Sequence, residues 1–206
     1  MWLWRKLPRL TSLGGSNNYL GVDNLVASAA LFESSNFFQL FSLPCGWKID
    51  RKLLDARYRK LQQEFHPDRF VAKGDVDKRL AMQTTSLINQ AYDTLKSPLK
   101  RAQYLLQLED IDAGQESHIT SDGQFLMQQI EFREALGDLN DSANPMAALN
   151  TLRSDVQSLY RQLQNDFEAQ HLAANYNDAL DTVAKMQFFA KLLDEIDQRE
   201  EELEDF

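Results

Sequence analysis

The chain has 206 residues, of which 43% are hydrophobic and 26% charged, and its formal net charge is −9. This length allows one or two domains with a hydrophobic core, and the negative charge argues against a general nucleic-acid binder, which would carry a basic surface. Because Cys45 is the single cysteine, no internal disulfide can form, and no apolar run approaches the ~20 residues of a membrane-spanning helix.

Glycine and proline are sparse, at eight and five residues, and the apolar residues recur mainly with a helical period. The sequence therefore predicts an all-α protein. The histidines, His66, His118 and His171, are far apart and have no cysteine cluster near them. We therefore expect no metal site and no cofactor.

Residues 1–35 carry Arg5, Lys6 and Arg9 and no acidic residue before Asp23. This acid-poor composition is compatible with a mitochondrial transit peptide, which would place the protein in the mitochondrial matrix. The segment contains no clean amphipathic helix, however. We favour a disordered leader or a translation start assigned too far upstream, with the folded part beginning at residue 36.

Residues 36–43 (NFFQLFSL) predict a short apolar helix, and Asp50 is a good N-cap for the helix that follows. This second helix is basic, with five bases and one acid in residues 51–60. Its apolar positions recur at spacings of four, three and four, which predicts one buried face. These positions are Leu54, Tyr58, Leu61 and Phe65.

The basic helix ends in the tripeptide His66-Pro67-Asp68. Proline lacks an N–H and disfavours helical backbone in the residue before it, so the helix is expected to end at His66 and to leave Asp68 on an exposed loop. Alone, such a tripeptide is a common helix stop. Beside a basic helix it is more typical of a contact surface. The bases around that helix are Arg57, Arg59 and Lys60.

A polar loop at residues 73–77 is expected to precede a second amphipathic helix, which runs to Leu95. Two helices of similar length with a tight connection predict an antiparallel helical hairpin. Pro98 then begins a connecting helix that runs to residue 108. Residues 109–120 (EDIDAGQESHIT) are acidic and turn-rich, so we place the domain boundary there.

Residues 121–206 predict a bundle of three antiparallel helices. Ser121 with Gln124 is a capping-box signature, Asn144 and Pro145 give a cap and a first-turn proline, and the last helix starts near Asn175. Core positions expected on the second helix are Leu149, Leu152, Val156, Leu159, Leu163 and Phe167. On the last helix they are Leu180, Val183, Met186, Ala190, Leu193 and Asp197.

The first helix of this bundle has two apolar sides. At ~100° per residue, one side holds Phe125, Phe132, Leu136 and Leu139 and is expected to face the core. The opposite side mixes apolar and acidic residues: Leu126, Met127, Ile130, Glu131, Glu134 and Asp138. Phe188 on the last helix also lies off its predicted core seam. Such a patch is typical of a protein interaction site, but burial of both sides against the first domain explains the pattern equally well.

The segment YRKLQQEFHPDR, followed by INQAYDTL, resembles the J domain of DnaJ-type co-chaperones over roughly residues 36–100. In that family the His-Pro-Asp motif and the basic helix contact a DnaK-type chaperone and stimulate its ATP hydrolysis. The resemblance implies this role for His66, Pro67 and Asp68, with Arg57, Arg59 and Lys60 as the electrostatic contact. It implies no catalytic residue within this chain.

With FLMQQIEFREAL and the closing LEDF, residues 36–206 resemble the HscB family of J-protein co-chaperones in iron–sulfur cluster biogenesis. The resemblance implies an IscU-type scaffold as client and an HscA-type chaperone of the DnaK family as partner. The scaffold-binding residues would be Leu126, Met127, Ile130, Glu131, Glu134, Asp138 and Phe188, with Asp138 where a glutamate is expected. The chain lacks the cysteine-rich zinc segment of some eukaryotic members, which favours a bacterial, cytoplasmic protein.

Three alternatives stay open on the sequence. An enzyme with His66 and Asp68 as an acid–base pair would need a pocket and a third orienting group, which the sequence does not indicate. In a nucleic-acid binder that used the basic helix, the acidic remainder of the chain would repel phosphate. A J-domain co-chaperone with a different client is the alternative within the same class.

Overall fold

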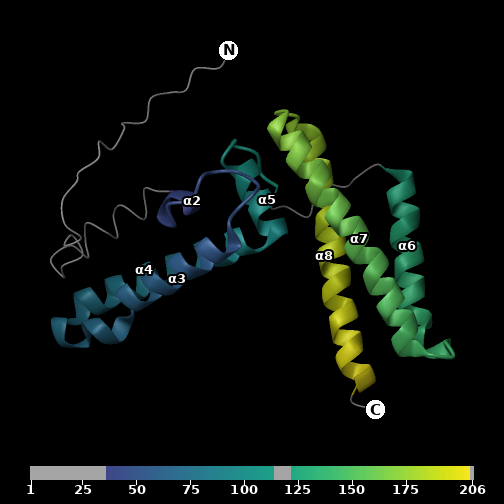
Figure 1. Cartoon of the computed structure of the whole chain (residues 1–206), viewed down its shortest axis with the longest axis horizontal. Coiled ribbons are helices and arrows are strands. Elements are labelled where there is room, and N and C mark those ends of the chain that lie inside the picture. The colour runs from purple at the N-terminus through teal and green to yellow at the C-terminus, as the bar shows by residue number, and fades with distance from the viewer. Residues whose placement is uncertain (1–35, 114–121, 205–206) are drawn as a thin grey trace.

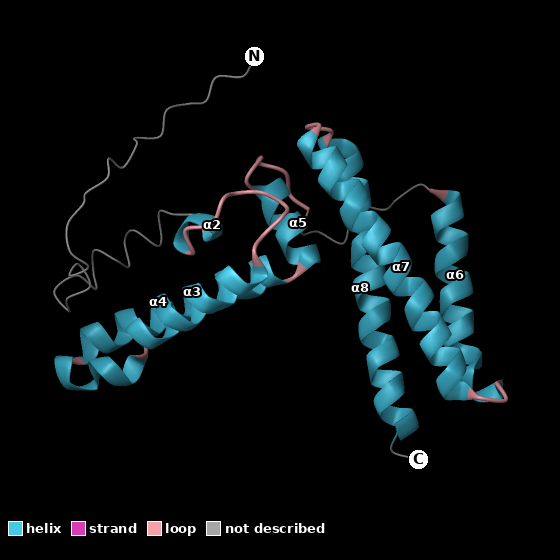
Figure 2. Ribbon diagram, in the orientation of Figure 1, coloured by secondary structure: helices cyan, strands magenta, loops and turns pink. Residues whose placement is uncertain are grey.

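The computed structural model describes residues 36–113 and 122–204, with the side chains of residues 71–73 and 140 left out. Within these ranges the protein is all-α, as predicted, and has an N-terminal J domain followed by a three-helix bundle (Figures 1 and 2). Residues 1–35, the predicted cap Ser121 and most of the predicted linker lie outside the described residues.

The J domain is built on an antiparallel pair of helices. The N-terminal elements are α2 (Phe37–Leu40), α3 (Arg51–Glu64), the 3₁₀ helix η2 (Pro67–Lys73), α4 (Asp75–Lys96) and α5 (Pro98–Gln107). The stacked rings of Tyr58 and Tyr92, 3.9 Å between centroids, join α3 to α4. The predicted hairpin is confirmed, and its closed end lies farthest from the C-terminal helices (Figure 1).

The connection between α3 and α4 is more ordered than predicted. The prediction of a polar loop at residues 73–77 is wrong, because Pro67–Lys73 form a 3₁₀ helix and α4 already begins at Asp75. Proline is tolerated at the first position of a helix, where its missing N–H has no intrahelical acceptor, so Pro67 both ends α3 and begins η2. Gly74, with φ 108°, makes the turn into α4, a conformation that L side chains rarely adopt.

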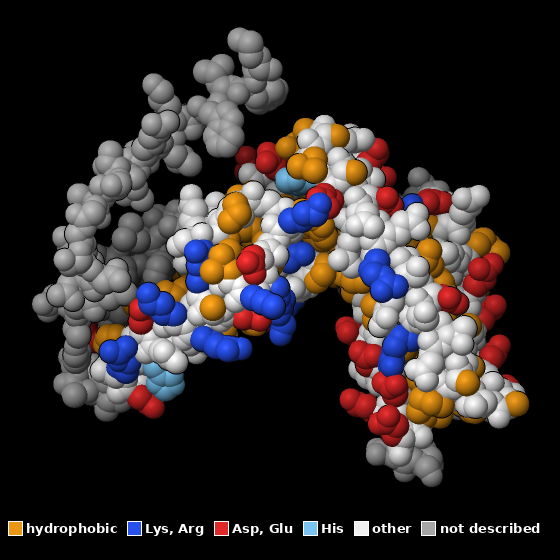
Figure 3. All heavy atoms as spheres, viewed as in Figure 1, with side chains coloured by type: hydrophobic (Ala, Val, Ile, Leu, Met, Phe, Trp, Pro, Cys, Tyr) orange, Lys and Arg blue, Asp and Glu red, His pale blue; other side chains and the backbone are white. Residues whose placement is uncertain are grey.

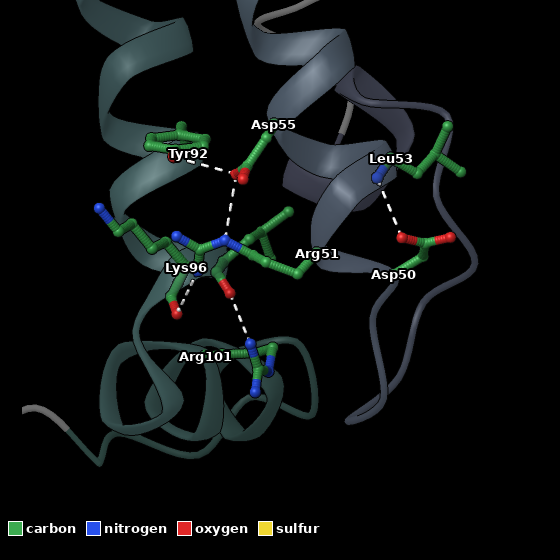
Figure 4. Close-up of polar contacts among 8 residues, drawn as sticks. Asp50, Arg51, Leu53, Asp55, Tyr92, Lys96 and Arg101 are labelled. Atoms are coloured by element: carbon green, nitrogen blue, oxygen red, sulfur yellow. Dashed lines mark hydrogen bonds and ion pairs between the residues drawn. The ribbon is translucent and has the colours of Figure 1, made fainter.

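Hydrogen bonds fix the open end of the hairpin onto α5 (Figure 4). The Asp55 carboxylate accepts from Arg51 Nε and from the Tyr92 hydroxyl, both at 3.0 Å. The Arg51 guanidinium also donates to the carbonyl of Lys96 at 3.0 Å, and Arg101 donates to the preceding carbonyl at 2.6 Å. The last turn of α4 is therefore held from both sides.

The C-terminal bundle consists of α6 (Gly123–Gly137), the 3₁₀ helix η3 (Asp138–Asp141), α7 (Pro145–Leu172) and α8 (Tyr176–Glu204). Asn144 and Pro145 start α7 as predicted. The cap of α6 is Asp122, one residue beyond the predicted position, and its carboxylate accepts from the backbone N–H groups of the second and third helical residues. Both caps satisfy donors that have no partner inside the helix.

The core positions predicted for α8 are correct only in the first half of the helix. Val183 and Met186 are buried as expected, but in the second half the buried positions are Phe189, Leu192 and Ile196. The predicted positions Ala190 and Leu193 are only partly buried, and Asp197 is exposed. The stripe shifts because the two halves of α8 pack in different hydrophobic clusters.

The J domain and the bundle share a continuous core. Phe167 of α7 is 0% exposed and belongs to the same cluster as the J-domain residues, together with Ala179, Val183 and Met186 of α8. Trp47 contacts the Phe167 ring, at 5.1 Å between centroids, and the Arg101 guanidinium covers the indole at 4.6 Å. The first half of α8 therefore packs on the J domain and the second half on α6 and α7.

Candidate protein-interaction sites

The His-Pro-Asp motif forms the exposed tip of the hairpin. The side chains of His66 and Asp68 are 53% and 85% exposed. His66 Nδ1 accepts a hydrogen bond from the backbone N–H of Asp68 at 3.3 Å, which makes His66 the cap of η2. Beside the ring lies a surface hollow of about 430 Å³, lined by Gln62, Gln63, His66 and Arg69.

The neighbours of the motif hold its backbone in place. Phe65 before it and Phe70 after it are both buried in the J-domain core. The Thr85 hydroxyl on α4 donates to the Phe65 carbonyl at 2.8 Å, and the Arg69 guanidinium donates to the carbonyl of Gln63 at 3.1 Å. The motif is therefore exposed but anchored on both sides. Neither Thr85 nor Arg69 was predicted from the sequence, although Arg69 directly follows the motif.

The three predicted bases of α3 differ in their surroundings. Arg59 and Lys60 are exposed, and the Lys60 ammonium lies 3.8 Å from the Glu64 carboxylate one turn away. The Arg57 guanidinium instead donates to the carbonyls of Phe41 and Ser42, both at 2.5 Å. Basic side chains nevertheless dominate the hairpin in Figure 3, while acidic ones gather toward the C-terminal end of α8.

The second candidate site is the outer side of α6. Leu126, Met127 and Ile130 are 43%, 59% and 50% exposed, so burial of this side against the J domain is excluded. The opposite side packs as predicted, with Phe125 buried and Phe132 partly buried in the bundle core. The three acids predicted for this surface, Glu131, Glu134 and Asp138, are exposed as well, although Asp138 lies just beyond the end of α6.

Phe188 lies at the border between the bundle core and this surface. Its ring is partly buried and meets Phe125 edge-on, at 5.7 Å between centroids. The Arg133 guanidinium of α6 lies 5.8 Å from the centroid of the Phe188 ring. Arg133 was not predicted from the sequence, because its place next to Phe188 depends on how α6 packs against α8. We call Leu126, Met127, Ile130, Glu131, Glu134, Asp138 and Phe188 the α6 patch.

In residues 36–113 and 122–204, no three histidine, cysteine, aspartate or glutamate side chains are placed to hold a metal ion. No helix within these ranges is both long and apolar enough to cross a bilayer. Cys45 is an exposed residue, but its sulfur is partly desolvated, and this desolvation together with the negative charge of Glu109 raises the pKa of the thiol. A raised pKa disfavours the reactive thiolate.

Comparison with known proteins identifies the family. Residues 121–197 match the family described as "HSCB C-terminal oligomerisation domain". The "Co-chaperone protein HscB homolog" of Shewanella halifaxensis is 39% identical over 173 residues, which are 82% of this chain and 99% of the relative. The structure matches the chaperone HscB from Vibrio cholerae with a TM-score of 0.74 and 37% identity, over 82% of this chain and 99% of that one.

The structure of human co-chaperone protein HscB also matches, with a TM-score of 0.74 and 26% identity, over 81% of this chain and 83% of the human chain. These matches cover the J domain and the bundle together, since they extend over about four fifths of the sequence. The resemblance noted from the sequence is confirmed. The chain belongs to the HscB family of co-chaperones.

Proposed function

We propose that the protein binds an IscU-type iron–sulfur scaffold through the α6 patch and delivers it to an HscA-type chaperone of the DnaK family. The J domain then stimulates the ATPase of that chaperone through His66, Pro67, Asp68 and the basic side of α3. The protein itself carries out no reaction in this scheme. Its place of action would be the bacterial cytoplasm.

The observation that carries the client half of this proposal is the exposure of Leu126, Met127 and Ile130 beside three acids. Exposed apolar side chains that form a patch rimmed by charge are typical of a protein-binding surface. Methionine suits such a surface because its flexible side chain adapts to a partner. The acids favour a client with basic residues around an apolar contact, because complementary charge raises the association rate and excludes wrong partners.

The arrangement of the two surfaces supports the chaperone half. The His-Pro-Asp motif and the α6 patch lie on different helical units, which leaves both accessible at once (Figure 1). A client held on the patch is tethered to the chaperone that the J domain contacts. Binding of the client to the chaperone then becomes nearly intramolecular and occurs at a high effective concentration.

Titration calorimetry with a purified cognate IscU-type scaffold tests the client assignment. We expect Leu126→Ala and Met127→Ala each to raise Kd by roughly tenfold, equivalent to about 1.4 kcal/mol, because each truncates an exposed apolar contact. The matched control is Met82→Ala on α4, since Met82 and Met127 are 54% and 59% exposed.

Equal weakening by all three substitutions would contradict a specific patch. A wild-type protein that stimulates the chaperone but does not bind the scaffold would show that the client is a different protein.

A further inference from the structure

Residues 1–22 are the longest stretch of this chain without an acidic residue. Within them, residues 2–10 (WLWRKLPRL) combine Trp2 and Trp4 with the three bases Arg5, Lys6 and Arg9, and we call residues 2–10 the basic leader. We propose that the basic leader binds the α6 patch of its own chain and competes there with the client. The contact itself does not depend on the proposed function, whereas the competition rests on it.

The family match gives no role to this part of the chain. The Shewanella halifaxensis relative is matched over 99% of its own length but over only 82% of this chain. The resemblance noted from the sequence covers residues 36–206 and therefore leaves out residues 1–35.

The α6 patch offers the basic leader an apolar surface. Leu126, Met127 and Ile130 are exposed within one stretch of five residues. The other large apolar side chains exposed in the described part of the chain occur singly along the sequence: Leu53, Val76, Met82, Leu108 and Leu172. Tryptophan buries a large apolar area, and tryptophan and arginine are the residue types most enriched among those that dominate binding energy. The composition of the basic leader therefore suits the α6 patch.

Charge directs the basic leader to the bundle and away from the J domain. Residues 122–206 hold eighteen acidic and six basic residues, whereas residues 36–113 hold ten acidic and thirteen basic ones. Figure 3 shows the same division, with Lys and Arg over the hairpin and Asp and Glu toward the C-terminal end of α8. Around the patch itself, residues 122–141 contain five acids and a single base, Arg133. A segment with three bases and no acid is attracted to this surface and repelled by the hairpin.

The connection is long enough for the contact. Phe37, near the start of the described chain, donates its N–H to the Tyr104 hydroxyl of α5 at 2.9 Å, and α5 shares a hydrophobic cluster with the first half of α8. At ~3.3 Å per residue, residues 11–35 span up to about 80 Å. The 29 residues of α8 cover only about 44 Å. The tether also holds the basic leader at a high effective concentration, so a weak contact is enough to cover the patch.

Tryptophan fluorescence tests the contact in the absence of any client. Trp47 is the only tryptophan outside the basic leader, so in a Trp47→Phe background the emission reports Trp2 and Trp4 alone. We expect a blue-shifted emission that moves to the red as salt concentration rises. Met127→Lys replaces an apolar contact by a repelling charge, and it should shift the emission to the red and raise the acrylamide quenching constant about twofold.

The matched control is Met82→Lys on α4, because Met82 and Met127 are similarly exposed. It should leave emission and quenching unchanged. If Trp47→Phe unfolds, the same two lysine variants are compared in the wild-type chain, where Trp47 contributes equally to both. Identical emission of Met127→Lys and Met82→Lys would overturn the contact. A blue shift that grows with protein concentration would place the basic leader on a second copy of the chain and would overturn the intramolecular contact.

Titration calorimetry with the purified IscU-type scaffold tests the competition. If the basic leader covers the patch for about two thirds of the time, the apparent Kd is about threefold the intrinsic value. The triple variant Arg5→Glu, Lys6→Glu and Arg9→Glu should therefore bind the scaffold about threefold more tightly than the wild type. The double variant Arg5→Lys and Arg9→Lys keeps the charge and should bind as the wild type.

The outcomes separate this inference from the proposed function. Unchanged affinity of the triple variant, when Leu126→Ala still weakens scaffold binding, would overturn the competition and leave the proposed function intact. Scaffold binding that Leu126→Ala does not affect would overturn the proposed function, while a red shift confined to Met127→Lys would still support the contact.

Discussion

Arg57 and Arg59 lie two residues apart on α3, and their side chains have different surroundings. Arg57 donates two hydrogen bonds to the carbonyls that follow α2, so it fixes the start of the J domain onto the basic helix. Arg59 is exposed. The resemblance to the J domain implied a chaperone contact for both of them. The acceptors of Arg57 are 15 and 16 residues away, and helical periodicity does not reveal such long-range partners.

Arg57→Ala is expected mainly to lower the stability of the protein, and Arg59→Ala mainly to weaken its contact with the chaperone. Removing the Arg57 hydrogen bonds should lower the free energy of unfolding by roughly 1–2 kcal/mol. Arg59→Ala should change it by less than about 0.5 kcal/mol, as is usual at exposed positions, but reduce stimulation of the chaperone ATPase. Urea unfolding and ATPase assays of the two variants provide the measurement. An unstable Arg59→Ala or a fully stable Arg57→Ala would contradict these roles.

His171, near the end of α7, is expected to make stability depend on pH. Burial lowers its pKa in the folded protein, which the charge of Glu109 partly offsets, and its Nε2 is buried without a hydrogen bond. The unfolded chain therefore takes up a proton more readily than the folded one. Stability is unaffected well above the ordinary histidine pKa of about 6.5 and is lost as pH falls through it.

The control for this effect is His171→Phe, which keeps a ring to stack on Phe167 but does not titrate. Between pH 7.5 and pH 5.5, we expect the melting temperature of the wild type to fall more than that of His171→Phe. His66→Gln, which removes an exposed ring, should behave as the wild type. Parallel pH profiles for all three proteins would contradict the assignment.

At the scale of the elements, the capping residue of α6 is expected to affect the α6 patch, because the patch lies mostly on this helix. The Asp122 carboxylate caps α6 and also pairs with Lys185 Nζ of α8 at 2.5 Å. The hydrogen bond from Lys185, together with those from the backbone, lowers the pKa of Asp122. This stabilisation is present above the ordinary aspartate pKa and is lost as pH falls through the lowered value.

Asp122→Ala is expected to loosen the start of α6. The melting temperature should fall by a few degrees, and affinity for the scaffold should fall several-fold although Asp122 lies outside the α6 patch. Asp122→Asn keeps a capping oxygen and loses only the ion pair, so its effect should be smaller. Calorimetry at pH 7 compares the two. Equal affinities for wild type and Asp122→Ala would show that the patch does not depend on this anchor.

The elements that the sequence predicted well are those determined by neighbouring residues. Asp50 and Asn144 cap their helices because each side chain reaches a backbone N–H three residues ahead. The second half of α8 was predicted one residue out of register, because its buried stripe follows packing against α6 and α7. Leu, Met and Ile beside acids on α6 contradict a simple amphipathic pattern, but that pattern alone left burial against the first domain equally possible, and only the family resemblance favoured an interaction surface.

At the scale of the whole molecule, Phe167 couples the J domain to the bundle. It is 0% exposed, contacts Trp47 of the J domain, and belongs to the cluster that joins the two units. Large buried side chains of this kind contribute strongly to stability through both transfer and packing. The shared core implies that the two units unfold together.

Phe167→Ala should therefore lower the free energy of unfolding by about 3–5 kcal/mol and separate the melting of the two units. Differential scanning calorimetry should show one transition for the wild type and a broadened or split transition for the variant. Leu126→Ala, an exposed substitution in the bundle, serves as the control and should retain one transition. Two resolved transitions in the wild type would contradict a shared core.

The central claim is that one chain presents a client on its bundle and activates a chaperone with its J domain. It is tested most directly by the steady-state ATPase rate of the cognate HscA-type chaperone with this protein, with the IscU-type scaffold, and with both. We predict stimulation by both together that exceeds the sum of the separate effects. His66→Gln should abolish the stimulation without destabilising the fold, and Leu126→Ala should reduce only the part that depends on scaffold. Stimulation that persists in His66→Gln, or that is indifferent to the scaffold, would contradict the account.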